Sequence, residues 1–178
     1  DGEDGGSAQL TGRVAWHNRS HESEAENVSD FRIDFAGVPF ADFARIRFEG
    51  IQTTGSVDGS VQITGNSANP LISGNALLRS VSLGDVDLDS VTSSFSYANR
   101  MVTGRLNAVE QGRRVFFADG TVPFDLSFMP VSERRLNEPM RFTVTADSAP
   151  ASLLTGFVGG LQNVRGIVNG SLVAGGTT

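Results

Sequence analysis

Short runs in which apolar and polar residues alternate recur along almost the whole chain, and this pattern constrains the fold more than any other feature. Phe31, Ile33 and Phe35 alternate with charged residues, and a period of two returns at intervals up to Ala174. That period places apolar side chains on one face of a β-strand and polar side chains on the other. Runs this short and this evenly spaced are typical of antiparallel strands. We therefore predict an all-β protein.

Two segments depart from this period and carry apolar residues at helical spacing. In Ser148–Leu161, Ser148 can cap a helix and Pro150 can stand in its first turn, and Val38–Ile46 makes a weaker case. We expect one or two short helices. The remaining predicted strands lie at Leu10–Trp16, Val57–Thr64, Ile72–Leu78, Val81–Leu83, Val86–Val91, Phe95–Tyr97, Val102–Ala108, Val115–Phe117, Val122–Phe128, Met140–Val144 and Gly166–Ala174.

Composition and charge exclude several classes of protein. The chain has 14 basic and 20 acidic side chains, a net charge of −6, so it lacks the basic surface that nucleic acid requires. It has no Cys, which excludes disulfides, thiolate metal sites and cysteine nucleophiles. With 39% hydrophobic and 19% charged residues it can bury a core.

A shift of 111 residues (142 − 31 = 111) aligns seven identical residues without a gap. The matched order is a strand, a helix that begins at a Pro, and a second strand with a Gly-x-Val-x-Gly-Ser pattern, which indicates an internal repeat. We expect residues 1–27 to end a preceding unit, 28–138 to form one unit and 139–178 to begin the next. The chain starts at Asp1 and ends within a strand pattern, so we expect it to be a piece of a longer chain. The matched pairs are Phe31/Phe142, Pro39/Pro150, Gly55/Gly166, Val57/Val168, Gly59/Gly170, Ser60/Ser171 and Gly65/Gly176.

Several glycines share the parity of the apolar residues in their strands. They leave gaps on a face that a flat, packed sheet would fill, and they allow the strands to bend. These glycines are Gly12, Gly59, Gly74, Gly104, Gly166 and Gly170. Repeated over successive strands, such gaps favour a sheet that curls around its own apolar face. The alternative is an ordinary sandwich or barrel with bulges.

Three segments resemble the repeat of the TamB/AsmA-like family of bacterial envelope proteins. They are residues 55–78, which begin GSVDGSVQITG, residues 119–127, DGTVPFDLS, and residues 163–177, NVRGIVNGSLVAGGT. The resemblance implies a U-shaped antiparallel sheet, the β-taco, with an apolar trough. It implies an inner-membrane-anchored protein in the periplasm that passes phospholipid toward the outer membrane and serves outer-membrane protein assembly. It also implies an Omp85-class outer-membrane barrel as partner.

A trough that binds acyl chains needs apolar walls and no catalytic group or cofactor. Free strand edges would also allow an unfolded outer-membrane β-strand client to add to the sheet. We expect the helical residues Leu154, Phe157, Val158 and Leu161 to lie against or inside the trough. The residues expected to line it are Val57, Val61, Ile63, Val102, Leu106, Val122, Phe124, Leu126, Phe128, Phe142, Val144, Leu154, Phe157, Val168 and Leu172.

Other candidate sites are weaker. His17 and His21 have the spacing of a helical metal pair, but they lie in a predicted loop, where that spacing does not converge. Asp85, Asp87 and Asp89 could hold calcium with Asp119, although exposed strand carboxylates are usually only solvated. We therefore expect no metal site. No Gly-x-Ser-x-Gly motif is present and no acid, base or nucleophile cluster stands out, so we do not expect an enzyme.

The competing hypothesis is a closed sandwich or barrel that serves adhesion or carbohydrate binding. Carbohydrate sites usually need exposed aromatic residues, and besides twelve Phe the chain has only Trp16 and Tyr97, which weakens this hypothesis. The arginine pairs Arg113–Arg114 and Arg134–Arg135 could contact phospholipid headgroups, but they fit solvated turns better.

Overall fold

The computed structural model describes residues 5–13, 29–44, 53–83, 86–151 and 165–177. The predictions on Trp16, the two histidines, Asp85, and the helical residues Leu154 and Phe157 lie outside these ranges. The elements are β1 (Ser7–Arg13), β2 (Ser29–Pro39), α1 (Phe40–Ala44), β3 (Thr53–Gly65), β4 (Pro70–Leu83), β5 (Val86–Ala98), β6 (Met101–Glu110), β7 (Arg113–Pro123), β8 (Pro139–Pro150) and β9 (Ile167–Thr177).

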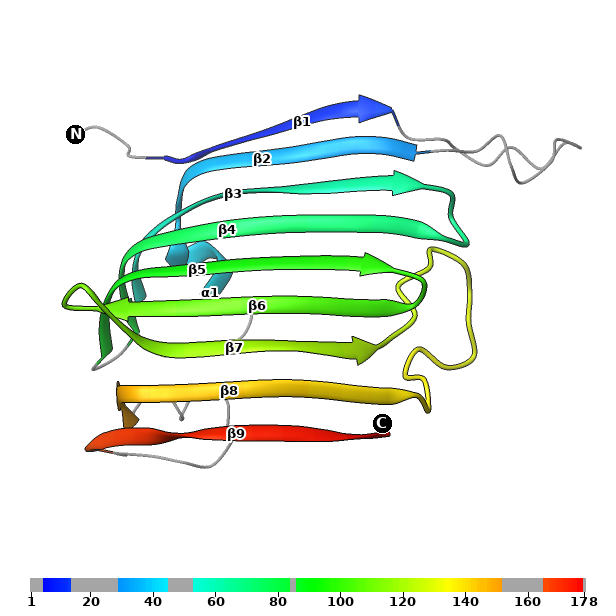
Figure 1. The fold of residues 1–178 in the computed structure, drawn as a ribbon. Coiled ribbons are helices and arrows are strands. Elements are labelled where there is room, and N and C mark those ends of the chain that lie inside the picture. The colour runs from blue at the N-terminus through cyan, green and yellow to red at the C-terminus, as the bar shows by residue number, and fades with distance from the viewer. Residues whose placement is uncertain (1–4, 14–28, 45–52, 84–85, 152–164, 178) are drawn as a thin grey trace, which may run out of the picture.

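All nine strands form one antiparallel sheet, and their order in the sheet follows their order in the sequence (Figure 1). β1 and β9 lie at the two edges and do not pair with each other, so the sheet of the described residues is open. The prediction of an all-β, curved antiparallel sheet is confirmed. The closed sandwich or barrel is excluded as the architecture of the described residues.

Two of the connections are two-residue hairpins whose residues have positive φ. Asn99 and Arg100 have φ of 51° and 60° between β5 and β6, and Gln111 and Gly112 have φ of 51° and 72° between β6 and β7. Positive φ at both positions is the geometry whose twist suits adjacent antiparallel strands. Asp89 strengthens the second turn, because its carboxylate accepts a hydrogen bond of 2.7 Å from the Gly112 N–H.

The register aligns the apolar positions of all nine strands in rows that cross the sheet. Because side chains alternate along each strand, the rows two residues before and two residues after a given row lie on the same face of the sheet as that row. The apolar face therefore continues from β1 to β9 without interruption. Its central row consists of Leu10, Ile33, Val61, Gly74, Phe95, Gly104, Gly120, Phe142 and Ala174.

Two glycines of this face accommodate an aromatic ring of the neighbouring strand. The Phe35 ring lies so close to Gly59 that a Cβ there would stand 2.8 Å from its Cε2. The Phe95 ring covers Gly74 at a similar distance. A glycine on one strand thus makes room for a ring on the next. The bend of the strands has another source, because register shifts occur in four strand pairs toward the end of the sheet where strands curve toward α1 (Figure 1).

A buried apolar cluster lies at this curved end. Phe40 of α1 packs against it, together with Leu78, Val91 and Phe116 of the sheet. Because the cluster draws on five strands, it holds the bend in place. Its buried members are Val81, Val86, Leu88, Ala108, Val115 and Ala149.

Two predicted boundaries are wrong. β7 ends at Pro123, so Phe124, Leu126 and Phe128 do not continue the strand. Proline lacks the N–H needed to extend the ladder, and the chain turns away after it. Ser148 and Pro150 belong to β8 rather than to the start of a helix, and Pro150 pairs with Ile167. The short helix expected in Val38–Ile46 is present as α1.

The structure of β2 and β3 recurs in β8 and β9. The register shift lies within Phe35–Val38 in the first pair and within Ala146–Ala149 in the second, which is 111 residues later. Inside each shift one residue has positive φ: Gly37 at 63° and Ser148 at 56°.

The hydrogen bond that holds each bulge recurs as well. The Gly37 N–H donates to Asp58 Oδ1 at 3.0 Å, and the Ser148 N–H donates to Asn169 Oδ1 at 2.7 Å. Both donors and both acceptors are 111 positions apart. The sequence repeat is therefore accompanied by a matching local geometry, while the unit boundaries remain predictions.

Candidate functional site

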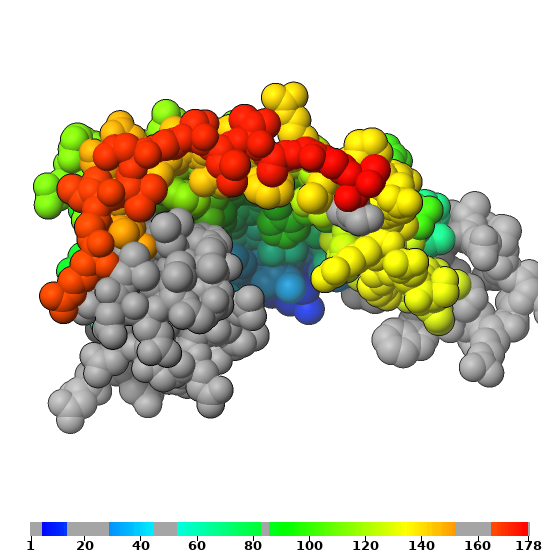
Figure 2. Space-filling view, turned by 90° about the horizontal axis from the view of Figure 1, so that it is seen from below, coloured from blue at the N-terminus to red at the C-terminus, as the bar shows by residue number. Residues whose placement is uncertain are grey.

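The apolar face is the concave face of the sheet, and segments at its two ends leave a trough between them. The Phe43 ring of α1 lies 6.0 Å from the Phe35 ring of β2, which places α1 on the apolar face. Figure 2 shows β9 arching over a hollow, with the segment that follows β7 at one side. Leu126 of that segment reaches the same face, because its N–H donates to the Tyr97 hydroxyl at 3.0 Å.

Several apolar side chains of this face are open to solvent. Phe95 in the middle of the sheet is 38% exposed, and Leu10 and Leu172 near the edges are 65% and 58% exposed. An apolar face of this extent, left open on a curved sheet, is typical of a binding surface.

One hollow on this face lies between β8 and β9. It has a volume of about 280 Å³, and nearly all of its wall is apolar. The predicted residues Val144, Val168 and Leu172 are among its walls. The full lining is Phe116, Val144, Ala146, Ala149, Pro150, Val168, Gly170, Ser171 and Leu172.

The internal repeat explains why the described residues leave this pocket open. In the first copy Phe35 pairs with Gly59, and the Phe35 ring fills the space above the glycine. In the second copy the corresponding pair is Ala146 and Gly170. A Cβ on Gly170 would meet no atom of the described residues within 4 Å. The pocket is therefore the space that a ring occupies in the first copy. Ala146 was absent from the predicted lining, although the 111-residue alignment could have indicated it.

Most of the predicted lining residues lie on this one face. The predicted residues of β3, β6, β7, β8 and β9 all have the parity of the central row or are spaced an even number of residues from it. Phe124, Leu126 and Phe128 lie instead in the 124–138 segment, which the structure places at one end of the trough. The face is shared by Val57, Val61, Ile63, Val102, Leu106, Val122, Phe142, Val144, Val168 and Leu172.

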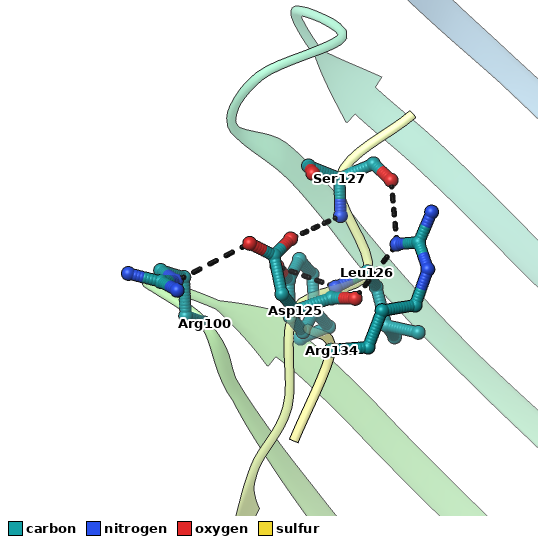
Figure 3. Close-up of polar contacts among 6 residues, drawn as sticks. Arg100, Asp125, Leu126, Ser127 and Arg134 are labelled. Atoms are coloured by element: carbon teal, nitrogen blue, oxygen red, sulfur yellow. Dashed lines mark hydrogen bonds and ion pairs between the residues drawn. The ribbon is translucent and has the colours of Figure 1, made fainter. Parts of the chain in front are cut away.

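A buried carboxylate organises the 124–138 segment (Figure 3). Asp125 is 6% exposed, and its carboxylate accepts a hydrogen bond of 2.8 Å from the Ser127 N–H and lies 3.4 Å from Arg100 Nε. Arg134 donates to the backbone carbonyls of Asp125 and Ser127, at 2.9 Å each. Sequence reasoning missed this cluster, although Asp-x-Ser directly after a Pro is typical of a side-chain-capped turn.

The pKa of Asp125 is lowered, first by the neighbouring Ser127 hydroxyl and then by the Ser127 N–H, with smaller effects of Arg100 and Arg134, while burial opposes the shift. Only the N–H has hydrogen-bond geometry, because the buried Ser127 hydroxyl makes no hydrogen bond in the described part of the chain. We therefore assign the stabilisation of the charged carboxylate mainly to the N–H.

A second hollow, of about 400 Å³, lies on the opposite, polar face. Its floor is the backbone of Gly104 and Gly120, and the residues on either side of them point away from the trough. Arg105, Asp119 and Arg141 line it together with Ser and Thr hydroxyls. This shallow groove is separated from the trough by the sheet itself.

Other types of site find little support among the described residues. No three His, Asp or Glu side chains gather there in a way that could hold a metal ion, so Asp87, Asp89 and Asp119 do not converge. Tyr97, one of two polar aromatics available for sugar binding, is 3% exposed and faces the trough. None of the described helices is long and apolar enough to cross a membrane.

Comparison of the chain with protein-family models, curated proteins and solved structures finds no match. The resemblance to the TamB/AsmA-like repeat therefore rests on the sequence segments quoted above.

Proposed function

We propose that this chain is a segment of a bacterial envelope-spanning protein that binds acyl chains in its apolar trough and passes phospholipid between the inner and outer membranes. The observation that carries the proposal is the open apolar pocket on the concave face, where Val144, Val168 and Leu172 meet. The resemblance to the TamB/AsmA-like repeat supports a role in outer-membrane biogenesis and protein assembly.

The size and chemistry of the pocket suit an acyl chain. A methylene group takes up about as much space as a water molecule, about 30 Å³, so the volume of about 280 Å³ holds on the order of nine methylenes. Each buried methylene contributes about 0.8 kcal/mol. The apolar rows continue across all nine strands. A lipid chain can therefore move along a continuous apolar surface that has no single site of much higher affinity.

The partners and location belong to the same proposal. The protein would lie in the periplasm as part of an inner-membrane-anchored chain, with an Omp85-class outer-membrane barrel as its partner. The open edges of β1 and β9 could accept an unfolded outer-membrane strand, since each edge has backbone groups without a partner strand among those described.

A matched pair of variants on β9 tests acyl-chain binding. Leu172 and Val173 are almost equally exposed, 58% and 59%, but they lie on opposite faces of the same strand. Leu172→Arg places a charge in the pocket, whereas Val173→Arg places the same charge on the polar face. Native mass spectrometry of gently purified protein should show bound phospholipid in the unaltered chain and in Val173→Arg, and none in Leu172→Arg.

Two results would contradict the proposal. A stable, lipid-free protein would indicate that the trough does not bind acyl chains, and a module for adhesion or carbohydrate binding would become the better explanation. Phospholipid that remains in folded Leu172→Arg would show that the lipid binds elsewhere.

A further inference from the structure

The segment between β7 and β8 carries three large apolar side chains at its tip. Phe128 is 54% exposed, Met129 44% and Val131 37%, and Pro130 between them is exposed as well. Large apolar side chains that gather within four residues of a loop, rather than singly, mark a surface for interaction.

The tip is held in this position by its own backbone. The Phe128 N–H donates to the Ser67 carbonyl at 2.8 Å, and the Asp125 N–H donates to the Arg134 carbonyl at 2.8 Å. The Arg134 guanidinium in turn binds the carbonyls of Asp125 and Ser127 (Figure 3). These bonds tie residues 125–127 to residue 134, so the tip projects from a closed base.

The base of the loop adjoins the apolar trough. Leu126 contacts the buried Tyr97 hydroxyl, which belongs to the concave face. In Figure 2 the yellow segment stands on the open side of the sheet, beside the hollow. Any surface that takes up the tip therefore lies next to the end of the trough.

The charges around the tip favour a lipid surface. Just behind the apolar residues stand Glu133 and Arg135, both exposed, and the Arg135 side chain makes no hydrogen bond or ion pair with the described residues. The Arg100 side chain is 52% exposed beside Asp125. An apolar tip with arginines behind it matches the order of acyl region and phosphate in a bilayer. The opposite charges nearly cancel, so apolar insertion rather than net charge has to drive binding.

We propose that the loop tip Phe128–Val131 docks the protein onto a phospholipid bilayer by inserting its apolar side chains at the interface. A deformable lipid surface takes up exposed apolar side chains of this kind without a matching pocket. This docking does not depend on whether the trough holds an acyl chain, so the two proposals can fail separately.

The test is flotation of the protein with vesicles of phosphatidylcholine and phosphatidylglycerol. Replacing both Phe128→Ser and Met129→Ser should lower the vesicle-bound fraction at least about tenfold, because two apolar side chains no longer enter the interface. The control replaces Ile167→Ser and Val173→Ser, which are 69% and 59% exposed on the polar face of β9, and should float like the unaltered protein. Circular dichroism checks the fold of each variant.

A second readout locates the tip itself. Met129→Trp in a Trp16→Phe background leaves one indole, since the chain has one Trp. Its fluorescence should shift to the blue on addition of vesicles, and the shift should change little with salt because net charge does not drive docking.

Three results would overturn the proposal: no flotation of the unaltered protein, equal flotation of the loop variant, or an indole that does not respond to vesicles. A fourth is a dimer in solution that the loop variant converts to a monomer while neither protein floats. That result would assign the tip to a second copy of the chain instead.

Discussion

Filling the pocket between β8 and β9 with the ring that the first copy of the repeat already has should weaken acyl-chain binding about fiftyfold without unfolding the protein. Ala146→Phe reproduces in β8 the arrangement of Phe35 over Gly59, because Ala146 pairs with Gly170 and the space above Gly170 is open. The added ring packs against apolar walls, so the free energy of unfolding should stay the same or rise.

The size of the effect follows from the atoms displaced. Phenylalanine adds six carbons to alanine, and at about 0.8 kcal/mol per buried carbon they displace up to about 4.8 kcal/mol of lipid contact. The pocket is open on one side, so we take about half, ~2.4 kcal/mol, which corresponds to about a fiftyfold loss of affinity.

A fluorescent fatty acid titrated into the protein measures this affinity directly. The control is Thr145→Phe, which puts the same ring on the same strand but on the polar face. It should bind the fatty acid like the unaltered protein. If folded Ala146→Phe binds the fatty acid with unchanged affinity, then the pocket between β8 and β9 is not the binding site and the reasoning from the repeat is wrong.

Two further predictions concern stability. A Cβ on Gly120 would stand 2.5 Å from the Phe142 Cβ, whereas one on Gly104, its partner in β6, would meet no atom of the described residues closer than 3.9 Å. Gly120→Ala should therefore lower the free energy of unfolding in urea by about 1–3 kcal/mol, and Gly104→Ala should change it little. Equal effects of the two would contradict the close approach of β7 and β8. Because the pKa of Asp125 is lowered in the folded state, its charge stabilises the protein above the unfolded pKa, and this stabilisation is lost as the pH falls through the folded pKa. Thermal denaturation of Asp125→Asn should show a lower midpoint at neutral pH and a smaller loss on acidification than the unaltered protein, and parallel pH profiles would refute this role.

The period of two predicted the strands well, because it reflects a property of each strand alone. The pattern places Ile33, Val61 and Phe142 each on the apolar face of its own strand, and the register brings all three into a single row across the sheet. The same period failed at Phe124–Phe128, where alternation continues after Pro123 but the partner strand does not. A pattern along one strand carries no information about where its neighbour stops.

The structural role of the glycines on the apolar face was also only partly predictable. The sequence indicated gaps on the apolar face and a curved sheet, both of which the structure has. It did not reveal that Phe95 covers Gly74, or that Gly170 is left uncovered, because both depend on the residue opposite in the next strand.

The sequence by itself determined the all-β class, the two faces of the strands and the repeat, since each of these is written in the local order of apolar, polar and glycine residues. Only the tertiary structure decided that the sheet stays open, that Tyr97 is buried under the 124–138 segment, and that the pocket lies beside Ala146. These features depend on strand pairing between residues far apart in the chain, and on which of the repeated positions carries a ring.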